Sequence, residues 1–320
     1  MVYSGIFIDE MQQLKDEWKL ALYDLLDDNK YMIMVGDYNQ EIRPKDKNEY
    51  KEEEDLIFLE IDEDDKNDAN IYYLGDIKFK KIILNKNYRN TIQITEGVNR
   101  LIRELKKYKT EFNYIERYDN SNVVLGISTK SGEKPEYIYA MDASSLKIKI
   151  KEIILHLIEN KGIEQEEIII LYPPNFTDNE DSKIYNNKTC GKISKATIEK
   201  IIKDELNLEF NDLTEGRSKV RNTGIKLSTI GKAIGLDFKA VIIFGLYNIR
   251  ASREKNIVFD NVEKIRNSDV DTKREVINSM KNIYVAASRA REYIYIIDDI
   301  DGTTKNIISE YVKKIGEKNG

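Results

Sequence analysis

GIFIDEMQQL, residues 5–14, is the stretch from which the fold of the whole chain can be worked out. The apolar run Ile6–Ile8 is followed at once by two carboxylates, Asp9 and Glu10, and then by Gln12. The run predicts a buried strand, and the acids lie where that strand ends. In open parallel α/β sheets, ligands bind at the carboxyl ends of the strands. The stretch therefore predicts a ligand site at this end of a sheet.

Paired carboxylates at the end of a buried strand are typical of the Walker B position of nucleoside triphosphatases. There they hold Mg²⁺ and position the attacking water. The matching phosphate-binding loop has the form Gly-x-x-x-x-Gly-Lys-Ser/Thr, and no such segment occurs in the 320 residues. Because adjacent acids also occur at ordinary strand ends, the pair alone leaves both interpretations open.

The composition is that of a globular chain. Its 320 residues are 41% hydrophobic, which is enough for one large domain or two ordinary ones. No apolar run approaches the roughly 18 to 20 residues that span a bilayer, and the chain does not begin with a secretion signal. One cysteine and one histidine leave no intramolecular disulfide and no Cys/His metal cluster within these residues. We expect a cytoplasmic protein with no membrane partner.

Charge is distributed unevenly along the chain. The net charge is −6, which by itself argues against a nucleic-acid binder. Residues 1–80 contain 22 acidic and 10 basic residues, a net −12, so residues 81–320 have a net charge of +6. Much of the acid lies in residues 52–68, which we interpret as a solvated surface insertion rather than a metal site. The asymmetry predicts two units, the second of them basic.

Strands and helices are expected to alternate along the first half of the chain. Apolar residues recur at helical spacing over 14–25, and Tyr31–Val35 predicts a second strand. Further elements expected in this half are strands over 81–84, 123–127 and 168–172 and helices over 94–105 and 150–157, the last of them closed by Gly162.

The remaining part continues the alternation. Ser194 can cap a helix over 198–206. Strands are expected over 225–229, 240–244 and 293–297, and helices over 276–287 and 307–312. Alternation of this kind predicts parallel sheets that are covered by helices on both faces. The expected fold class is therefore α/β.

Five segments, in this order, resemble motifs II to VI of the UvrD/Rep-like superfamily 1 DNA helicases. They are IDEMQ (8–12), VGDYNQ (35–40), LNKNYRNT (84–91), KLSTIGKAIGLDFKAVII (226–243) and NIYVAASRAREYIYII (282–297). Each segment alone is a weak signal, and their ordered co-occurrence over nearly the whole chain makes the resemblance. It implies two RecA-like P-loop NTPase lobes with parallel sheets. The first lobe, residues 1–80, would be incomplete, and the second would occupy residues 81–320.

The resemblance implies roles for four residues of the first lobe. Asp9 would hold Mg²⁺, and Glu10 would orient or deprotonate the attacking water. Gln12 and Gln40 would sense the γ-phosphate of ATP. Such residue types suit phosphoryl transfer, which needs charge stabilisation and a positioned water more than covalent chemistry.

For the second lobe, the resemblance implies a set of groups around the same nucleotide. Tyr88 would stack on the adenine and Arg89 would reach the γ-phosphate. Arg289 matches the arginine finger, a cation that neutralises charge in the transition state. The remaining residues expected against the nucleotide are Gly235, Asp237 and Arg291. A simpler explanation for the two late arginines is that they follow a helix, whose C-terminus favours cations.

The chain departs from the family pattern in one loop and after one glutamine. Where the family has Thr-x-His-x-x-Lys-Gly-x-Glu-Phe, this chain has Gly231, Ile234 and Asp237 in place of the His, Lys and Glu. After Gln40 it lacks the aromatic-Arg pair that stacks on single-stranded bases. The loop departures weaken the expected coupling between DNA binding and ATP. The missing aromatic-Arg pair weakens the expected contacts with bases of single-stranded DNA.

Two classes of function follow. In the first, the chain is part of an ATP-dependent 3′–5′ DNA helicase or translocase, inactive without a Walker A loop supplied by a separate N-terminal segment. Its cofactors would be ATP and Mg²⁺, and its partners single-stranded DNA, with RNA as the alternative, and a companion protein such as a nuclease. In the second, the chain is a non-hydrolysing, degenerate helicase module that binds nucleic acid or a partner protein.

Overall fold

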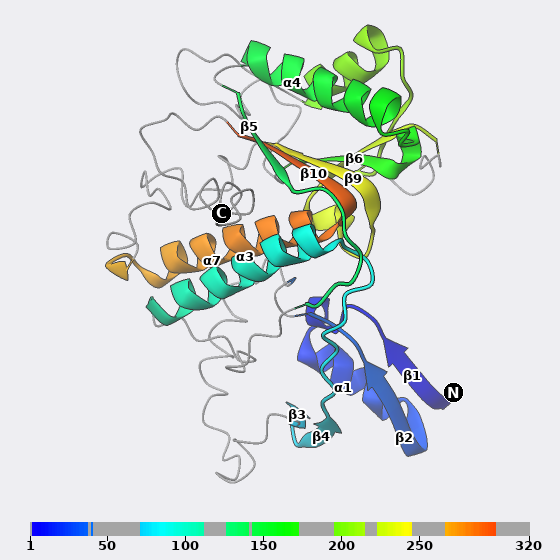
Figure 1. Cartoon of the computed structure of the whole chain (residues 1–320). Coiled ribbons are helices and arrows are strands. Elements are labelled where there is room, and N and C mark those ends of the chain that lie inside the picture. Colours follow the sequence, from blue (N-terminus) through cyan, green and yellow to red (C-terminus); the bar gives the residue numbers. More distant parts are fainter. Residues whose placement is uncertain are drawn as a thin grey trace. The chain divides into compact units, whose positions relative to one another are not determined.

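The largest element of the computed structural model is a parallel sheet of six strands (Figure 1). The structure describes residues 2–37, 40, 71–111, 126–140, 143–172, 195–214, 223–244 and 266–298. Across the sheet, the strands run in the order β5 (Glu136–Tyr139), β10 (Ala290–Asp298), β9 (Phe238–Phe244), β6 (Ile168–Tyr172), β8 (Ile225–Thr229) and β7 (Phe210–Asp212). All neighbours pair in parallel, which confirms the α/β fold class.

Both faces of this sheet are apolar. Alternate residues of a strand point to opposite faces, and the central strands have apolar residues at consecutive positions. In β9, Ala240, Ile242 and Phe244 belong to one core cluster, whereas Val241 and Ile243 are equally buried outside it. The same alternation separates the residues of β6 and β10. A sheet that is apolar on both faces must be covered on both faces.

Helices cover the two faces as that pattern requires (Figure 1). On one face lie α4 (Ala143–Leu155), continued by the π-helical turn η4 (His156–Asn160), and α5 (Lys195–Lys200), continued by η6 (Ile201–Glu205). On the other, α3 (Ile92–Glu111) and α7 (Val270–Ser288) lie side by side. Gly162 follows η4 with φ +63°, the conformation of a helix C-cap.

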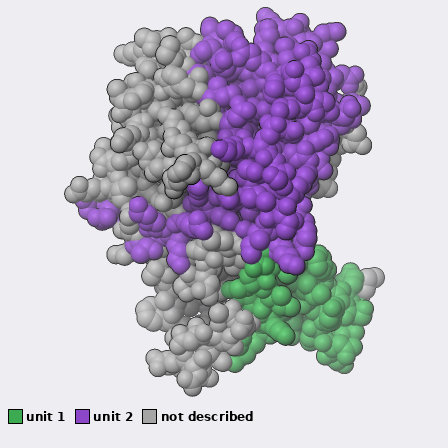
Figure 2. Space-filling model, in the orientation of Figure 1, with its two compact units in different colours: residues 1–85, 115–124 green, residues 86–114, 125–320 purple. Residues whose placement is uncertain are grey.

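The chain divides into two compact units (Figure 2). Unit 1 comprises residues 1–85 and 115–124, and unit 2 comprises residues 86–114 and 125–320. The six-stranded sheet and its helices belong to unit 2. The first division falls after Asn85, whereas the sequence analysis places the boundary after residue 80. That the two units are RecA-like lobes remains a prediction.

Unit 1 is built on two parallel strands, β1 (Tyr3–Ile8) and β2 (Leu26–Met34). They are joined by a short 3₁₀ turn, η1 (Met11–Gln13), and by α1 (Asp16–Asp24). Phe7 pairs with Ile33 in the ladder, and these side chains are 65% and 40% exposed. One face of this small sheet is thus apolar and exposed, although parallel sheets are usually buried on both faces. The expectation of a buried strand at Ile6–Ile8 is therefore wrong in part: a strand forms there, but only Ile8 is buried.

A β-hairpin completes the described part of unit 1. Strands β3 (Ile71–Leu74) and β4 (Ile77–Lys80) are antiparallel, and Gly75 occupies the turn with φ +56°. Leu74 is fully buried, and the Tyr23 ring of α1 meets the Phe79 ring edge to face at 6.1 Å between centroids. The hairpin therefore packs on α1.

Most of the expected elements are confirmed, and one is wrong. Residues 81–84 form no strand and have no ladder partner among the described residues. Ile82 and Leu84 are 72% and 79% exposed, so this apolar run is an exposed connection. The β3–β4 hairpin and the two edge strands, β5 and β7, were not predicted from the sequence. The expectations for residues 52–68, 123–125, Ser194 and 307–312 lie outside the described residues.

The described helices are not membrane-spanning elements. None of those in the described part of the chain combines the length and the apolar composition that crossing a bilayer requires.

Candidate functional site

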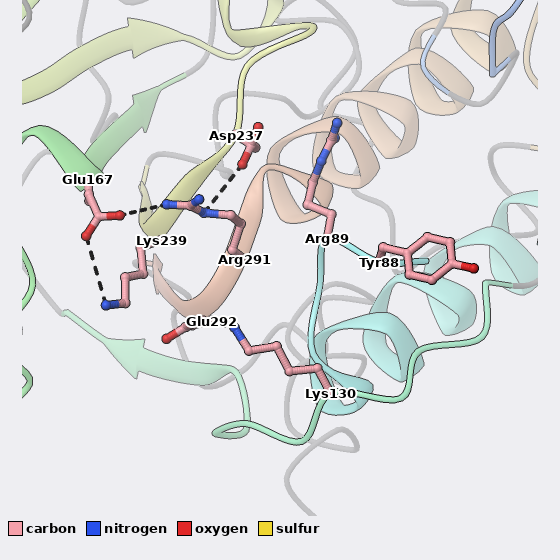
Figure 3. A pocket seen from close by; sticks show the side chains of 8 residues that line it. All are labelled: Tyr88, Arg89, Lys130, Glu167, Asp237, Lys239, Arg291 and Glu292. Atoms are coloured by element: carbon pink, nitrogen blue, oxygen red, sulfur yellow. Dashed lines mark hydrogen bonds and ion pairs between the residues drawn. The ribbon is translucent and has the colours of Figure 1, made fainter. Parts of the chain in front are cut away.

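Unit 2 contains a pocket of about 590 Å³ that is lined almost entirely by charged side chains (Figure 3). Four of the lining residues are ones that the sequence analysis expected at a nucleotide: Tyr88, Arg89, Asp237 and Arg291. The others are Lys130, Glu167, Lys239 and Glu292. Segments separated by up to about 200 residues in the sequence thus meet at one site.

The pocket lies at the amino ends of the sheet strands. Glu167 ends a short 3₁₀ turn, η5 (Gln165–Glu167), directly before β6, and Asp237 directly precedes β9. Arg291 and Glu292 belong to the start of β10. The carboxyl-end rule that draws attention to Asp9 in unit 1 would therefore point to the other end of the strands in this second sheet.

Ion pairs link most of the charged side chains in the pocket (Figure 3). Arg291 Nη2 donates to Glu167 Oε1 at 2.8 Å, and Arg291 Nε lies 3.4 Å from Asp237 Oδ2. Lys239 Nζ lies 3.9 Å from Glu167 Oε2, and Lys130 pairs with Glu292. Because the Arg291 pairs are about one-third exposed, each contributes about 1 kcal/mol or less to stability. An incoming anion can therefore compete with these carboxylates at modest cost.

Tyr88 and Arg89 are both exposed residues of the pocket lining. The Tyr88 residue is 83% exposed, and its ring points away from the ion pairs in Figure 3. No hydrogen bond or ion pair to the Arg89 guanidinium is found within the described part of the chain; only its backbone N–H is bonded, to Asn87 Oδ1 at 3.0 Å. In Figure 3 the Tyr88 ring and the Arg89 guanidinium point in different directions. An open aromatic face can stack on a base, and an exposed guanidinium can bind an anion.

Arg289 is placed differently from Arg291, two residues later in the sequence. It is 1% exposed and is absent from the pocket lining. Its guanidinium donates to Val285 O at 3.1 Å, to Leu236 O at 3.2 Å and to Ser288 Oγ at 2.9 Å. In this structure, the side chain expected to be an arginine finger braces the turn before β9 against the end of α7.

The turn before β9 depends on a glycine. Gly235 has φ +80°, a conformation that residues with a side chain seldom adopt. It follows the short 3₁₀ helix η8 (Gly231–Ala233) and Ile234, and it precedes Leu236 and Asp237. Gly235 thus permits the turn that leads to Asp237, which lines the pocket. That the two residues lie against a nucleotide remains a prediction.

In unit 1, the four residues expected at a phosphate and Mg²⁺ also lie together: Asp9, Glu10, Gln12 and Gln40. Glu10 N–H donates to Asp9 Oδ1 at 2.9 Å, and Gln12 Nε2 donates to Glu10 Oε2 at 2.6 Å. The cluster is completed by Asp37, whose N–H donates to Gln12 Oε1 at 3.1 Å and whose Oδ2 accepts from Gln40 Nε2 at 3.1 Å. All five residues follow the carboxyl ends of β1 and β2, where the sequence analysis expects a site.

Two backbone features hold this cluster. Glu10 has φ +52°, a left-handed conformation that costs a non-glycine residue about 1 kcal/mol or more and is common at functional sites. Gly36 permits a close approach, since a Cβ there would lie 2.3 Å from Gln12 Oε1. Gln12 itself is 2% exposed, so its amide supports Glu10 rather than reaching solvent.

Five residues of these two sites were not predicted from the sequence. Asp37 lies in the segment VGDYNQ, but no role was expected for it. Its position after the end of the second strand could have indicated a site residue. The other four lie at strand starts or in a loop, and nothing in the local sequence distinguishes them from ordinary surface charges. They are Lys130, Glu167, Lys239 and Glu292.

Comparisons with known proteins add little to this geometry. No protein-family model matches the chain, and no curated protein matches its sequence. Among solved structures, the chain is similar to the C-terminal domain of a possible DNA helicase from Lactobacillus plantarum WCFS1, with 13% identity and a TM-score of 0.35, over 66% of this chain and 87% of that one. A TM-score of this size is too low for the likeness to bear on fold or activity.

Proposed function

We propose that this chain is part of an ATP-dependent 3′–5′ DNA helicase or translocase of the UvrD/Rep type. The observation that carries the proposal is the composition of the unit 2 pocket. Tyr88, Arg89, Asp237 and Arg291 come from three separate motifs of the resemblance, yet they line one cavity. Three motifs that resembled a helicase by chance would have no reason to converge in this way.

The pocket residues suit a nucleoside triphosphate. Arg89, Lys130, Lys239 and Arg291 are four cations against three carboxylates, and bidentate arginine is well matched to phosphate. Tyr88 would stack on the base, Arg89 would bind the terminal phosphate, and Arg291 would exchange a carboxylate partner for phosphate. Arg289 would act as an arginine finger only after its bond to Leu236 O is broken.

The unit 1 cluster suits Mg²⁺ and a water molecule. No group of three or more acidic, histidine or cysteine side chains that could hold a metal is found in the described ranges. Magnesium, however, is commonly held by one or two carboxylates together with phosphates and water. Asp9 would serve as that carboxylate and Glu10 would orient the water, while Gln12 and Gln40 would respond to the terminal phosphate through the bonds that join them to Glu10 and Asp37.

Hydrolysis requires one further part. The backbone N–H groups and lysine of a Walker A loop bind the phosphates in P-loop enzymes, and no such loop occurs in this sequence. We propose that another polypeptide segment supplies it, and that single-stranded DNA stimulates hydrolysis only in its presence. Binding of ATP to the unit 2 pocket would be weak without it.

A titration with a ribose-labelled fluorescent ATP analogue and Mg²⁺ tests the proposal on the whole chain. Arg89→Ala should weaken binding about tenfold or more, because a hydrogen bond to a charged group contributes about 1.5 to 3 kcal/mol. Arg103→Ala is the matched control, since Arg103 is an exposed arginine on α3 outside the pocket. Equal affinity in the wild type and both variants, or no saturable binding at all, would overturn the proposal.

A non-hydrolysing binding module is the second candidate, and one observation favours it. Three of the four pocket cations are already paired with pocket carboxylates, so most of the positive charge of the site is balanced without a ligand. In that case, nucleotide would not saturate the pocket, whereas single-stranded DNA would bind elsewhere on the chain with an affinity that falls steeply with salt.

A further inference from the structure

The two arginines of the pocket come from segments that lie side by side. Arg89 belongs to residues 86–91, before α3, and Arg291 to the start of β10. Thr91 N–H donates to Arg291 O at 3.2 Å, which is one direct link between these backbones. The relative position of the two guanidinium groups therefore depends on what else fastens the segments together.

Asn90 is the side chain that does so. It is 3% exposed, and its Nδ2 donates to Ser288 O at 3.2 Å and to Ala290 O. These two carbonyls flank Arg289 in the sequence. One amide nitrogen thus binds the backbone on both sides of the arginine that precedes β10, and both of its hydrogens are used.

The other end of the Asn90 amide is fastened as well. Asn90 Oδ1 accepts from Asn87 Nδ2 at 2.6 Å, and Asn87 Oδ1 accepts from the N–H groups of Arg89 and Asn90, each at 3.0 Å. Ser128 Oγ donates to Asn90 O at 2.6 Å. Every polar atom of the Asn90 side chain has a partner, so the amide orientation is fixed: a reversed amide would place an oxygen against two carbonyl oxygens.

We propose that Asn90 is a positioning residue that holds Arg89 and Arg291 at the separation needed to bind one polyphosphate together. The inference rests on the proposed function, because it concerns the nucleotide pocket. The residue type is specific. An aspartate would set a carboxylate against Ser288 O and Ala290 O, and an apolar side chain would remove the donor that Asn90 gives to each of these carbonyls.

The test compares Asn90→Ala with a matched variant, Asn99→Ala. Asn99 is also an amide that binds backbone at both ends, donating to Gly126 O at 2.8 Å and accepting from Gly126 N–H at 2.9 Å. It fastens α3 to the segment after residue 125 but makes no bond to residues 288–291. Both variants are titrated with ribose-labelled ATP and ADP analogues, and amide hydrogen exchange is measured over residues 86–91 and 288–291.

The expected result is a change in the preference for ATP over ADP, which a general loss of stability would not produce. Asn90→Ala should lower the ratio of the two affinities at least fivefold and speed exchange at Thr91, while Asn99→Ala should leave the ratio within twofold of wild type. If Asn90→Ala fails to fold, Asn90→Ser, which keeps one donor, should lower the ratio more than twofold relative to wild type.

Two failures can be told apart. If the wild-type chain prefers ATP and Asn90→Ala, or Asn90→Ser where it is needed, prefers ATP equally, the positioning role alone is overturned. If the wild-type chain shows no preference for ATP over ADP, the proposed function is overturned, and the positioning role with it.

Discussion

Replacing Arg289 by alanine separates a structural role from a catalytic one. The resemblance implies an arginine finger, which would be held ready for a ligand, whereas the structure buries the side chain with bonds to Val285 O, Leu236 O and Ser288 Oγ. Loss of the bond to Leu236 O removes a charged donor that links α7 to the turn before β9. A bond of that kind contributes about 1.5 to 3 kcal/mol, and truncation of a buried side chain leaves a cavity as well. We expect Arg289→Ala to lower the free energy of unfolding of unit 2 by about 2 to 4 kcal/mol.

Urea unfolding followed by two probes measures this effect. The only tryptophan of the chain, Trp18, lies in α1 of unit 1, so its fluorescence reports on unit 1. Most of the described helix belongs to unit 2, so far-ultraviolet circular dichroism reports mainly on that unit. The dichroism transition should move to lower urea while the fluorescence transition stays in place.

A surface arginine provides the matched control. Arg103→Ala removes an exposed side chain and should change stability by less than about 0.5 kcal/mol. If Arg289→Ala is as stable as Arg103→Ala, the buried guanidinium does not brace the turn before β9, and a structural role for Arg289 is refuted.

Two further predictions concern stability alone. Burial opposes ionisation of Asp212, but its pairing with Lys195 and its bond from Thr214 N–H outweigh that effect and lower the pKa below the ordinary 3.8. The stabilisation is therefore present above pH 3.8 and lost as pH falls through the folded-state pKa of Asp212. Asp212→Asn should therefore be less stable than wild type in urea at pH 7, and the difference should shrink only as the pH falls below 3.8 toward the folded-state pKa. Gly224→Ala should destabilise unit 2 by about 2 kcal/mol or more, because Gly224 has φ +75° and an added Cβ would lie 2.5 Å from Glu209 C. Gly162→Ala is the control: Gly162 has φ +63° but open space around an added Cβ, so the substitution should cost about 1 kcal/mol. Equal urea midpoints for the two variants would contradict this prediction.

The fold of unit 2 was largely predictable because its strands are buried on both faces. Apolar runs such as Ile168–Tyr172 and Ala240–Phe244 have no polar alternation, and a continuous run bounded by turn residues indicates a central parallel strand. The edge strands β5 and β7 have only four and three residues, which is too short for a periodic signal. The run at residues 81–84 misled for the opposite reason: it is apolar but exposed.

The candidate sites were predictable only in part. Asp9 and Glu10 stand out because they follow a strand, and Tyr88, Arg89 and Arg291 were found through the family resemblance. Glu167 and Lys239 could not have been found, since their significance lies in a pairing with each other and with Arg291 across strands. The burial of Arg289 could not be predicted from the local sequence either. Arg289 and Arg291 are only two residues apart, yet Arg289 is buried and Arg291 lines the pocket.

Photolabelling with 8-azido-ATP is the strictest test of a nucleotide site in unit 2, because it records where on the chain the base lies even when binding is weak. The labelled chain is digested, and the modified peptide is identified by mass spectrometry. We predict that the label falls on residues 86–91, that unlabelled ATP in excess removes it, and that Tyr88→Ala abolishes it while leaving the urea transitions unchanged. Label spread over unrelated surface peptides, or label that ATP does not compete away, would contradict a nucleotide site at Tyr88 and Arg89.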